Sequence, residues 1–497
     1  MAKRARSISH RGQKTKAGYV PADLSESKIP DYVVVELRYE APVAFTAARF
    51  AAPAAAAPQA ESLNSVLARF DIKTMRSHFG LPASAIRSRI ELAATLPAEP
   101  DPKRFAKRGM DTEFIESGFV QVVPKASEDA KKIAKALNSQ RAVWKAYVAP
   151  RPVPAMPAGS AAGSRNFEPA QGYLYDAPNG IGAEDVWSLA GAKGKGITIC
   201  DIEGNWNRKH EDLPTGIELL GGTPIDDLGW RNHGTAVLGE MVSISDGRGC
   251  VGISHQAKAV VHSAVINGVF NTAGAISSAA TRLKAGDVML IELQATGPNG
   301  KYVAMQFWPD IFSAIKAAVD KGITVVEAAG NGDENFELAV FNGTGLQKDS
   351  GAIVVGAGVP PTNHLDFDGF GAGFPSYASL GVPRSRIFFS NYGKIVNVQG
   401  WGWHVTTLGY GDAQGGTSEN TWYTLRFSGT SSASPIVTGA VACLQGRAKA
   451  KNGAPLTPKK VRDILMSTGT PQQAGPGVPL TQHIGPLPNL VEAMKKV

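Results

Sequence analysis

The sequence predicts an α/β protein: a doubly wound parallel sheet in its larger C-terminal part, preceded by a small α+β domain. Short apolar runs alternate with helix-patterned segments through the second half, as in a parallel sheet covered by helices. A stretch rich in Pro, Gly, Ala and Ser separates this half from a shorter front part. The chain has 497 residues, 43% of them hydrophobic, which is enough for two or more domains with full cores.

These observations divide the chain into four parts. Residues 1–30 are a basic tail that we expect to be disordered, and residues 31–150 are the α+β domain, called the N-terminal domain below. Residues 151–170 are a linker, and residues 171–497 are the α/β domain, called the C-terminal domain.

The N-terminal domain mixes strand and helix patterns. Strands are expected where β-branched and aromatic residues cluster, at 32–37, 119–123 and 142–148. Helices are expected at 62–70 and 129–137. The alanine- and proline-rich piece 51–60 and the proline-rich piece 95–103 are expected to be loops.

The C-terminal domain alternates in the order that a parallel sheet requires. Strands are expected at 196–201, 258–266, 288–293, 323–329 and 353–355, and helices at 272–284 and 307–320. Gly322 ends the second of these helices, and Thr457 with Pro458 begins a late one. A terminal helix is expected at 489–496 and a surface insertion at 359–387.

The charge is distributed unevenly. Residues 1–165 carry 26 Lys/Arg against 15 Asp/Glu, a net of +11, and the remainder carries 25 against 28, a net of −3. No motif that interleaves basic and aromatic residues accompanies the positive charge, so we expect no nucleic-acid partner. The two regions either attract each other or reflect a basic tail.

Composition also indicates which cofactors and which cellular compartment to expect. The three cysteines are far apart and nine histidines form no ligand motif, so a metal cluster is not predicted. Cys200 and Cys443 lie in apolar runs and are expected to be buried. No apolar stretch reaches membrane-spanning length, and no standard secretory signal follows the basic start, which favours the cytoplasm.

A turn of small residues leads directly into an apolar helix at 427–442. Gly429 permits a tight turn, Pro435 suits the first turn, and Ser431 then lies at the helix N-terminus. Free backbone N–H groups there stabilise negative charge near the hydroxyl. Taken alone, such a serine is more often only a helix cap.

Two further polar residues stand at element ends. Asp201 closes a short apolar run typical of a buried parallel strand, at the end where α/β sheets place their chemistry. His233 stands at the start of a helix of small residues. Asp, His and Ser in this chain order are one of the known orders of a hydrolytic triad.

These motifs resemble the subtilase family of serine peptidases. The resemblance rests on Asp201 with 210–213 (His-Glu-Asp-Leu), His233-Gly234-Thr235, the Ala-Ala-Gly-Asn-Gly sequence at 328–332, and 429–435. It departs from the family pattern after Asp201, where Ile202-Glu203-Gly204 replaces the usual small residue and glycine.

The resemblance implies a subtilisin-like peptidase domain and an acyl-enzyme on Ser431. His233 is expected to be the general base, with Asp201 orienting it. The tetrahedral intermediate needs donors for its oxyanion, and the Ser431 backbone N–H and the Asn331 amide supply them. Without the triad, Asn331 would be interpreted as a turn residue. No cofactor is required for this chemistry.

Substrate and metal positions follow from the same resemblance. Gln294, Ala295, Thr296 and Gly297 are expected to line one edge of the cleft and Gly274 the other, with polypeptide substrates held as an added strand. Asp212 and Asp246 lie where the family binds structural Ca²⁺, although both are equally interpretable as turn residues.

The family also implies that the N-terminal domain is ferredoxin-like and acts as an intramolecular inhibitor and chaperone of a zymogen. The linker is then the self-cleavage site, although a plain spacer has the same composition. Two other functions stay open: a catalytically silent binding module, which the Ile202-Glu203 departure favours, and a peptide ligase or cyclase that uses the same acyl-enzyme.

Overall fold

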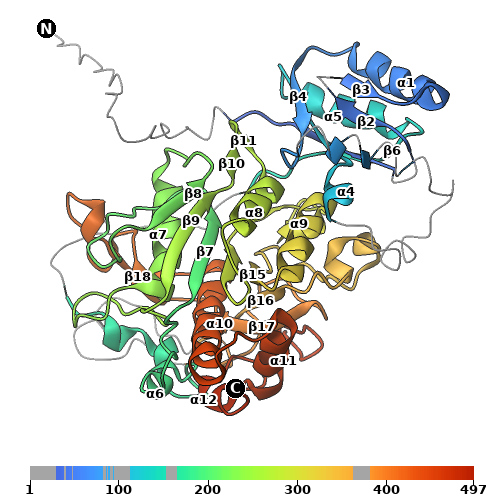
Figure 1. Ribbon diagram of the computed structural model, residues 1–497. Helices are drawn as coiled ribbons and strands as arrows, with labels where there is room; N and C mark the ends of the chain where they lie inside the picture. The colour runs from blue at the N-terminus through green and yellow to red at the C-terminus, as the bar shows by residue number, and fades with distance from the viewer. Residues whose placement is uncertain are drawn as a thin grey trace, which may run out of the picture.

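A seven-stranded parallel sheet forms the centre of the C-terminal domain (Figure 1). The computed structural model describes residues 29–38, 41–46, 49–81, 85–86, 88–89, 93, 112–152, 165–361 and 381–497. The strand order is β17-β16-β15-β12-β7-β9-β8, and each neighbouring pair is parallel. The strands are β7 (Thr198–Glu203), β8 (Glu218–Gly221), β9 (Lys258–Ser263), β12 (Val288–Ile291), β15 (Thr324–Ala328), β16 (Ile353–Gly358) and β17 (Val396–Trp401). The predicted parallel sheet is confirmed.

Helices cover both faces of this sheet. Helices α7 (Leu228–Val242), α10 (Thr430–Asn452), α11 (Pro458–Thr468) and α12 (Leu490–Met494) share one core with strand residues such as Ile199 and Leu290. Helices α8 (Thr272–Ala280) and α9 (Pro309–Asp320) share the other with Cys200 and Met289. Because successive residues of a strand point to opposite faces, the continuous apolar strands supply both cores. The doubly wound arrangement is thereby established.

One helix end and one helix start lie where the sequence predicts them. Gly322 follows α9 with a φ of +85°, a left-handed conformation that glycine adopts easily. The Thr457 side chain accepts a hydrogen bond from the Lys460 N–H and caps α11. Shorter elements complete the domain: α6 (Ala183–Val186) and the hairpins β10 (Val265–Ile266) with β11 (Val269–Phe270), β13 (Gln294–Thr296) with β14 (Tyr302–Ala304), and β18 (Val405–Leu408) with β19 (Tyr423–Phe427).

The N-terminal domain is an antiparallel four-stranded sheet in the order β4-β5-β1-β6, with helices packed on one face. Its elements are β1 (Val33–Leu37), the hairpin β2 (Ala44–Thr46) and β3 (Arg49–Ala51), α1 (Ala57–Leu67), β4 (Ile72–Ser77), α4 (Thr112–Glu116), β5 (Phe119–Pro124), α5 (Asp129–Asn138) and β6 (Val143–Val148). The loop predicted at 51–60 is wrong in its second half, because α1 begins at Ala57 and tolerates Pro58 in its first turn. Residues 94–111 lie outside the described part of the chain.

The uncovered face of this small sheet packs on the C-terminal domain near α8, α9 and the β10–β11 hairpin (Figure 1). Three residues of the N-terminal sheet, Tyr32, Val34 and Phe119, share an apolar cluster with Val269 of β11. A polar group lies beside the cluster: Asp310 of α9 is 2.6 Å from His78 Nε2 and accepts a 2.5 Å hydrogen bond from the Tyr147 hydroxyl. The two domains therefore share an interface that combines an apolar cluster with a buried carboxylate.

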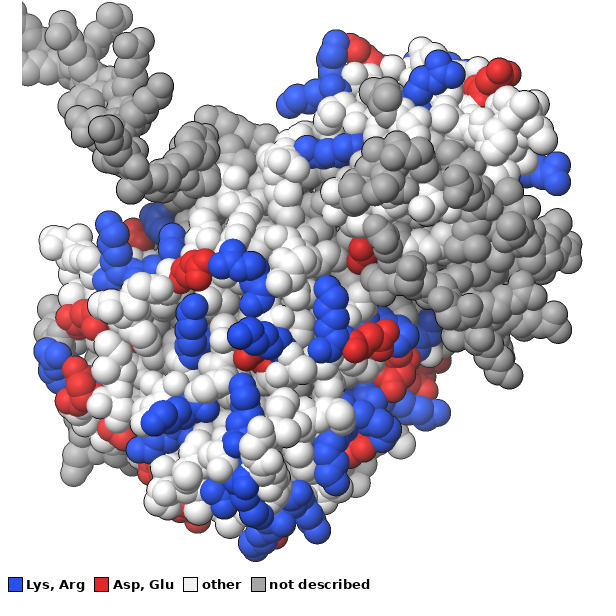
Figure 2. Space-filling view, in the orientation of Figure 1, with Lys and Arg blue, Asp and Glu red and all other residues white. Residues whose placement is uncertain are grey.

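Surface charge, the cysteines and helix hydrophobicity complete the description of the fold. Lys and Arg side chains are scattered over both domains on the face that Figure 2 shows, with Asp and Glu among them. All three cysteines are buried and free, as expected for Cys200 and Cys443. In the described ranges, none of the helices combines the length and apolar character needed to cross a bilayer.

Candidate active site

Two carboxylates project from the same face of β7, an interior strand of the sheet. Asp201 and Glu203 are two residues apart, so both point toward the core that contains α7 and α10. Both side chains are fully buried. Glu203 is the last residue of the strand and is therefore nearer the carboxyl edge of the sheet. Position along the strand decides which of them can reach the histidine.

The histidine contacts Glu203 rather than Asp201. His233 Nδ1 lies 2.5 Å from Glu203 Oε2, and both side chains are shielded from solvent. The Gly204 N–H donates a 3.0 Å hydrogen bond to the other oxygen, Oε1, so the carboxylate is held at both ends. An imidazole that donates from Nδ1 keeps Nε2 as its acceptor, which is the tautomer a general base needs. Nε2 is buried and has no hydrogen-bond partner among the described residues.

The prediction that Asp201 orients His233 is wrong. Asp201 Oδ2 accepts a 2.7 Å hydrogen bond from the indole Nε1 of Trp206 instead. Burial, followed by the charge of Glu203, raises the pKa of Asp201 well above its usual value. Burial therefore favours the neutral form of this carboxyl, which is a structural partner of the indole. The strand-end position of Glu203 is the signal that could have identified it.

Helix α7 carries the imidazole past the end of β7. The helix begins at Leu228, with Asp227 accepting a hydrogen bond from the Trp230 N–H as its cap. His233 is therefore in the second turn, not at the helix start as expected. A Cβ at Gly204 would overlap the Trp230 indole, and only glycine allows α7 to approach the strand end this closely.

Ser431 is the second residue of α10, as the sequence predicts. Gly429 precedes the helix with a φ of +107°, and Thr430 is the first helical residue. Ser431 is only 6% exposed, so its hydroxyl is nearly enclosed. Pro435 lies in the second turn rather than the first, because α10 begins at Thr430. The neighbouring Phe427 ring packs edge-to-face against His233, with 5.4 Å between ring centroids.

The structure orients Asn331 as an amide donor. Its Oδ1 accepts hydrogen bonds from the Thr430 N–H at 2.8 Å and from the Thr430 hydroxyl at 3.0 Å. The Nδ2 group therefore remains to donate, and it faces the backbone at Gly429, two residues before the serine. This geometry suits an oxyanion donor next to Ser431.

A third carboxyl lies at the serine and was not predicted. Glu292 follows β12, and its Oε2 is 2.6 Å from the Ser434 hydroxyl. The other oxygen, Oε1, is buried and has no hydrogen-bond partner among the described residues. Burial raises the pKa of Glu292 well above its usual value. No sequence motif marks this residue, and a lone Glu after a strand is more often a surface residue.

Glu240 of α7 is a fourth buried acid in the same region. Neither of its carboxyl oxygens has a hydrogen-bond partner within the described part of the chain. Burial, followed by the charge of Glu292, raises its pKa well above the usual value. Four acids are therefore buried beneath the serine helix, and only Glu203 contacts a histidine.

The predicted substrate-edge residues are only partly placed at an edge. Residues 294–296 form β13, which pairs with β14, and Gly297 follows it. The Gln294 side chain does not serve as a free cleft residue, because it accepts a 2.8 Å hydrogen bond from the Asn331 N–H. Ala295 is fully buried and Thr296 is exposed. Gln294 thus braces the oxyanion donor, which the sequence did not indicate.

The prediction for Gly274 is wrong. This residue lies inside α8, and its N–H donates to the side chain of Asn271, the helix cap. An N–H used in this way cannot pair with a substrate strand. The Asn271 amide instead donates to the His78 carbonyl of the N-terminal domain.

The candidate calcium residues do not fit a calcium site. Asp246 is bound by Arg248, through its backbone N–H and its guanidinium at 3.0 and 2.8 Å. Asp212 Oδ2 accepts a 2.7 Å hydrogen bond from the Cys250 N–H, and burial raises its pKa to about 8. Calcium requires several ionised oxygen ligands that converge. Within the described residues, no group of three or more His, Cys, Asp or Glu side chains has metal-binding geometry.

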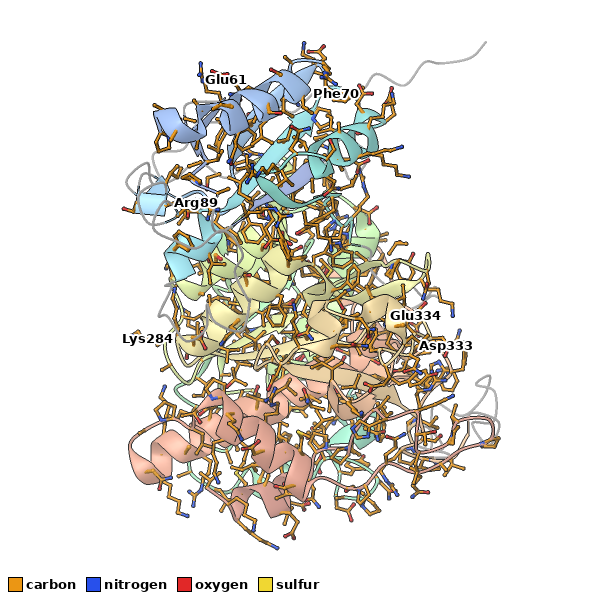
Figure 3. All side chains as sticks on the ribbon, turned by 90° about the vertical axis from the view of Figure 1, so that its right-hand side faces the viewer. Glu61, Phe70, Arg89, Lys284, Asp333 and Glu334 are labelled. Atoms are coloured by element: carbon orange, nitrogen blue, oxygen red, sulfur yellow. The ribbon has the colours of Figure 1, made fainter. Side chains whose placement is uncertain are left out.

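The acidic residues that follow Asn331 bind side chains of neighbouring segments. Figure 3 shows Asp333 and Glu334 side by side at one flank of the C-terminal domain. Asp333 pairs with Arg386 at 2.9 Å, and Glu334 accepts a hydrogen bond from the Asn299 amide. They stabilise the loop that carries Asn331.

Comparisons with known proteins agree with the arrangement of strands and helices. A family model described as the subtilase family matches residues 194–485. Over 280 residues the chain is 25% identical to the major intracellular serine protease of Bacillus subtilis (strain 168), covering 53% of this chain and 73% of that protein. Over 161 residues it is 30% identical to the subtilisin-like serine protease Pen ch 18 of Penicillium rubens, covering 32% of this chain and 26% of that protein.

A solved structure shares the fold over most of the chain. It is fervidolysin from Fervidobacterium pennivorans, described as a keratinolytic enzyme related to subtilisin. The TM-score is 0.50 at 16% sequence identity, and the match covers 94% of this chain and 61% of that chain. The matched region is long enough to include both domains.

Proposed function

Since the chain belongs to the subtilase family of serine peptidases, we propose that it is an endopeptidase with a Glu203–His233–Ser431 triad. The observation that carries this proposal is the 2.5 Å contact between His233 Nδ1 and Glu203 Oε2. Polypeptides are the substrates. The departure from the family sequence after Asp201 then reflects a change of the acid, rather than the loss of catalysis.

The chemistry begins with proton transfer from Ser431. A serine hydroxyl is a weak nucleophile at neutral pH and needs an adjacent base. His233 accepts this proton at Nε2 as Oγ attacks the scissile carbonyl carbon. Glu203 stabilises the imidazolium that forms, through the hydrogen bond at Nδ1. The imidazolium then returns the proton to the leaving amine, and water releases the acyl group by the same route.

Negative charge develops on the former carbonyl oxygen in each half of the reaction. The Ser431 N–H at the start of α10 and the Asn331 Nδ2 group donate to this oxygen. Thr430 holds the Asn331 amide by its carbonyl oxygen, so the donor is oriented before substrate arrives. No metal or organic cofactor takes part in these steps.

We also propose that the N-terminal domain is an intramolecular inhibitor and chaperone of a zymogen. The shared apolar cluster and the Asp310 group support this, since an interface of this kind stabilises the folded C-terminal domain. The linker, of which residues 153–164 lie outside the described ranges, is the proposed cleavage segment.

The test is reaction with a fluorophosphonate probe together with intact-mass analysis. The wild-type protein should be labelled at Ser431, hydrolyse a peptide substrate and be cleaved within 151–170. The Ser431→Ala variant should do none of these. Ser432→Ala is the matched control, because Ser432 donates its hydroxyl to the Trp401 carbonyl and faces away from the chemistry. Activity that survives in Ser431→Ala would refute the proposal.

A further inference from the structure

Glu292 lies directly beside the triad acid on the neighbouring strand. The parallel register of β12 and β7 pairs Leu290 with Asp201 and Ile291 with Ile202, so the next pair is Glu292 with Glu203. The Glu292 N–H donates to the Ile202 carbonyl and continues this register beyond the strand. Side chains paired in this way are about 5 Å apart at their bases. Two carboxylates so close and so well buried cannot both carry charge without a large cost.

The hydrogen bonds around Ser434 indicate which of the two is neutral. The Ser434 hydroxyl is 2.7 Å from the Thr430 carbonyl and 2.6 Å from Glu292 Oε2. A hydroxyl has one proton, and a carbonyl can only accept. When Ser434 donates to Thr430, the contact with Glu292 is a hydrogen bond only if Glu292 carries a proton and donates it. Glu203, by contrast, receives two N–H donors.

Within the described part of the chain, no Lys or Arg is among the groups that interact with Glu292. Strand β7 presents Asp201 and Glu203 to it, and α7 presents Glu240. Helix α10 presents the hydroxyls of Ser431 and Ser434. Glu327 of β15 is paired in register with Ile291, so it points to the opposite face of the sheet, where it accepts from the Gln306 N–H. The one imidazole of this group, His233, is engaged at Nδ1 by Glu203.

We propose that Glu292 is a positioning residue whose neutral carboxyl, through the Ser434 hydroxyl and the Thr430 carbonyl, supports the first turn of α10 that carries Ser431, and that loss of its proton sets the alkaline limit of the peptidase. This inference rests on the proposed function. An ionised Glu292 would draw the Ser434 proton away from the Thr430 carbonyl and so disturb the turn that holds Ser431. It would also place a negative charge beside the developing oxyanion. Both effects lower the rate, and neither operates while the carboxyl is protonated.

The consequence is a bell-shaped pH dependence of kcat/KM. The acid limb reports the protonation of His233 and the alkaline limb reports the ionisation of Glu292. Above the alkaline midpoint, kcat/KM of the wild-type protein should fall about tenfold per pH unit. Glu292→Gln keeps the shape of the side chain and removes the ionisation, so its kcat/KM should stay level over the same range while its acid limb is unchanged.

The matched control is Glu327→Gln, the same substitution at an equally buried acid on the other face of the sheet. It should keep the alkaline limb of the wild-type protein. Circular dichroism at each pH separates inhibition from unfolding. If Glu292→Gln does not fold, Glu292→Ala also removes the ionising group and should lose the limb.

A second measurement does not depend on turnover. In the infrared difference spectrum between wild-type protein and Glu292→Gln at neutral pH, a carboxylic-acid C=O band should be present and should disappear at alkaline pH. A wild-type profile without an alkaline limb, a limb that persists in both Glu292 variants, or the absence of this band would overturn the inference. Absence of activity at every pH, with the band present, would instead refute the proposed peptidase function.

Discussion

Replacing the acid of the proposed triad by its amide, Glu203→Gln, is the most direct test of the site. In the structure the two oxygens of Glu203 accept from different donors, Gly204 N–H and His233 Nδ1–H. An amide has only one oxygen. If that oxygen keeps the Gly204 hydrogen bond, the NH₂ group faces His233 and forces Nδ1 to accept. The proton then moves to Nε2, and the imidazole can no longer take a proton from Ser431.

The expected loss is large, since this is the wrong tautomer of the base. Amide substitution of a triad acid typically lowers kcat by about 10⁴, which corresponds to about 5.5 kcal/mol of barrier. The buried site offers no water to replace the carboxylate, because Glu203 and His233 are both shielded from solvent. Steady-state hydrolysis of a chromogenic peptide at saturating substrate measures kcat, and the rate of fluorophosphonate labelling measures the nucleophile alone.

Asp201→Asn is the comparison that makes the test specific. Asp201 accepts from the Trp206 indole, and an amide oxygen can accept the same hydrogen bond. Burial raises the pKa of Asp201 and so favours its neutral form, and the substitution introduces a neutral group of the same shape. We expect kcat to change by no more than a few-fold. A loss of about 10⁴ in Asp201→Asn, with Glu203→Gln close to wild type, would refute the assignment of Glu203.

Three further changes test other parts of the structure. Asn331→Ala should lower kcat by about 10²–10³ with little change in KM, as steady-state kinetics would show, because it removes a donor used mainly in the transition state. Asp310→Ala, in the Ser431→Ala background, should increase hydrogen exchange across β1 and α9, because it leaves His78 and Tyr147 without their shared acceptor; unchanged exchange would contradict this role. Glu327→Gln tests pH-dependent stability, since burial raises the pKa of Glu327 to about 8, from a usual value of 4.5. The stability that this protonated group contributes is complete below pH 4.5 and is lost as pH rises to 8, at about 1.4 kcal/mol per pH unit. Urea unfolding at pH 5 and 8 should therefore show a smaller loss in the variant than in the parent protein, by at most about 4 kcal/mol.

The fold could be predicted from the sequence where local patterns agree with the final structure. Continuous apolar strands alternating with helices indicated a parallel sheet, and Gly322 and Thr457 gave helix ends that the structure confirms. Strand β4 was missed because its residues, Ile72–Ser77, are mostly polar and half-buried, so no run of apolar residues marks it. Helix α1 was predicted at 62–70 but spans Ala57–Leu67; its start was missed because proline near a helix start resembles a loop signal.

The active site could be predicted only as far as single motifs define it. Ser431 and Asn331 stand in short glycine-containing sequences whose backbone geometry is local. The choice between Asp201 and Glu203 depends on how far β7 extends and where α7 crosses it, which is a tertiary property. Gly274 was misplaced for a similar reason: the Asn271 cap that encloses it is visible only once the helix boundary is known. Glu292 has no local signal and is brought to Ser431 by the register of two strands.

The four buried acids differ in the hydrogen-bond donors that they receive. Glu203 receives two N–H donors, one of them from an imidazole that becomes positive during the reaction. Asp201 receives one indole N–H, and Glu292 contacts the Ser434 hydroxyl. Glu240 has no hydrogen-bond donor among the described residues. A buried charge is tolerated only where donors compensate its lost hydration, and burial raises the pKa of Asp201, Glu292 and Glu240. Acids whose neutral form is favoured can surround the nucleophile with less opposition to the oxyanion, and the difference among these acids follows the number of donors at each position.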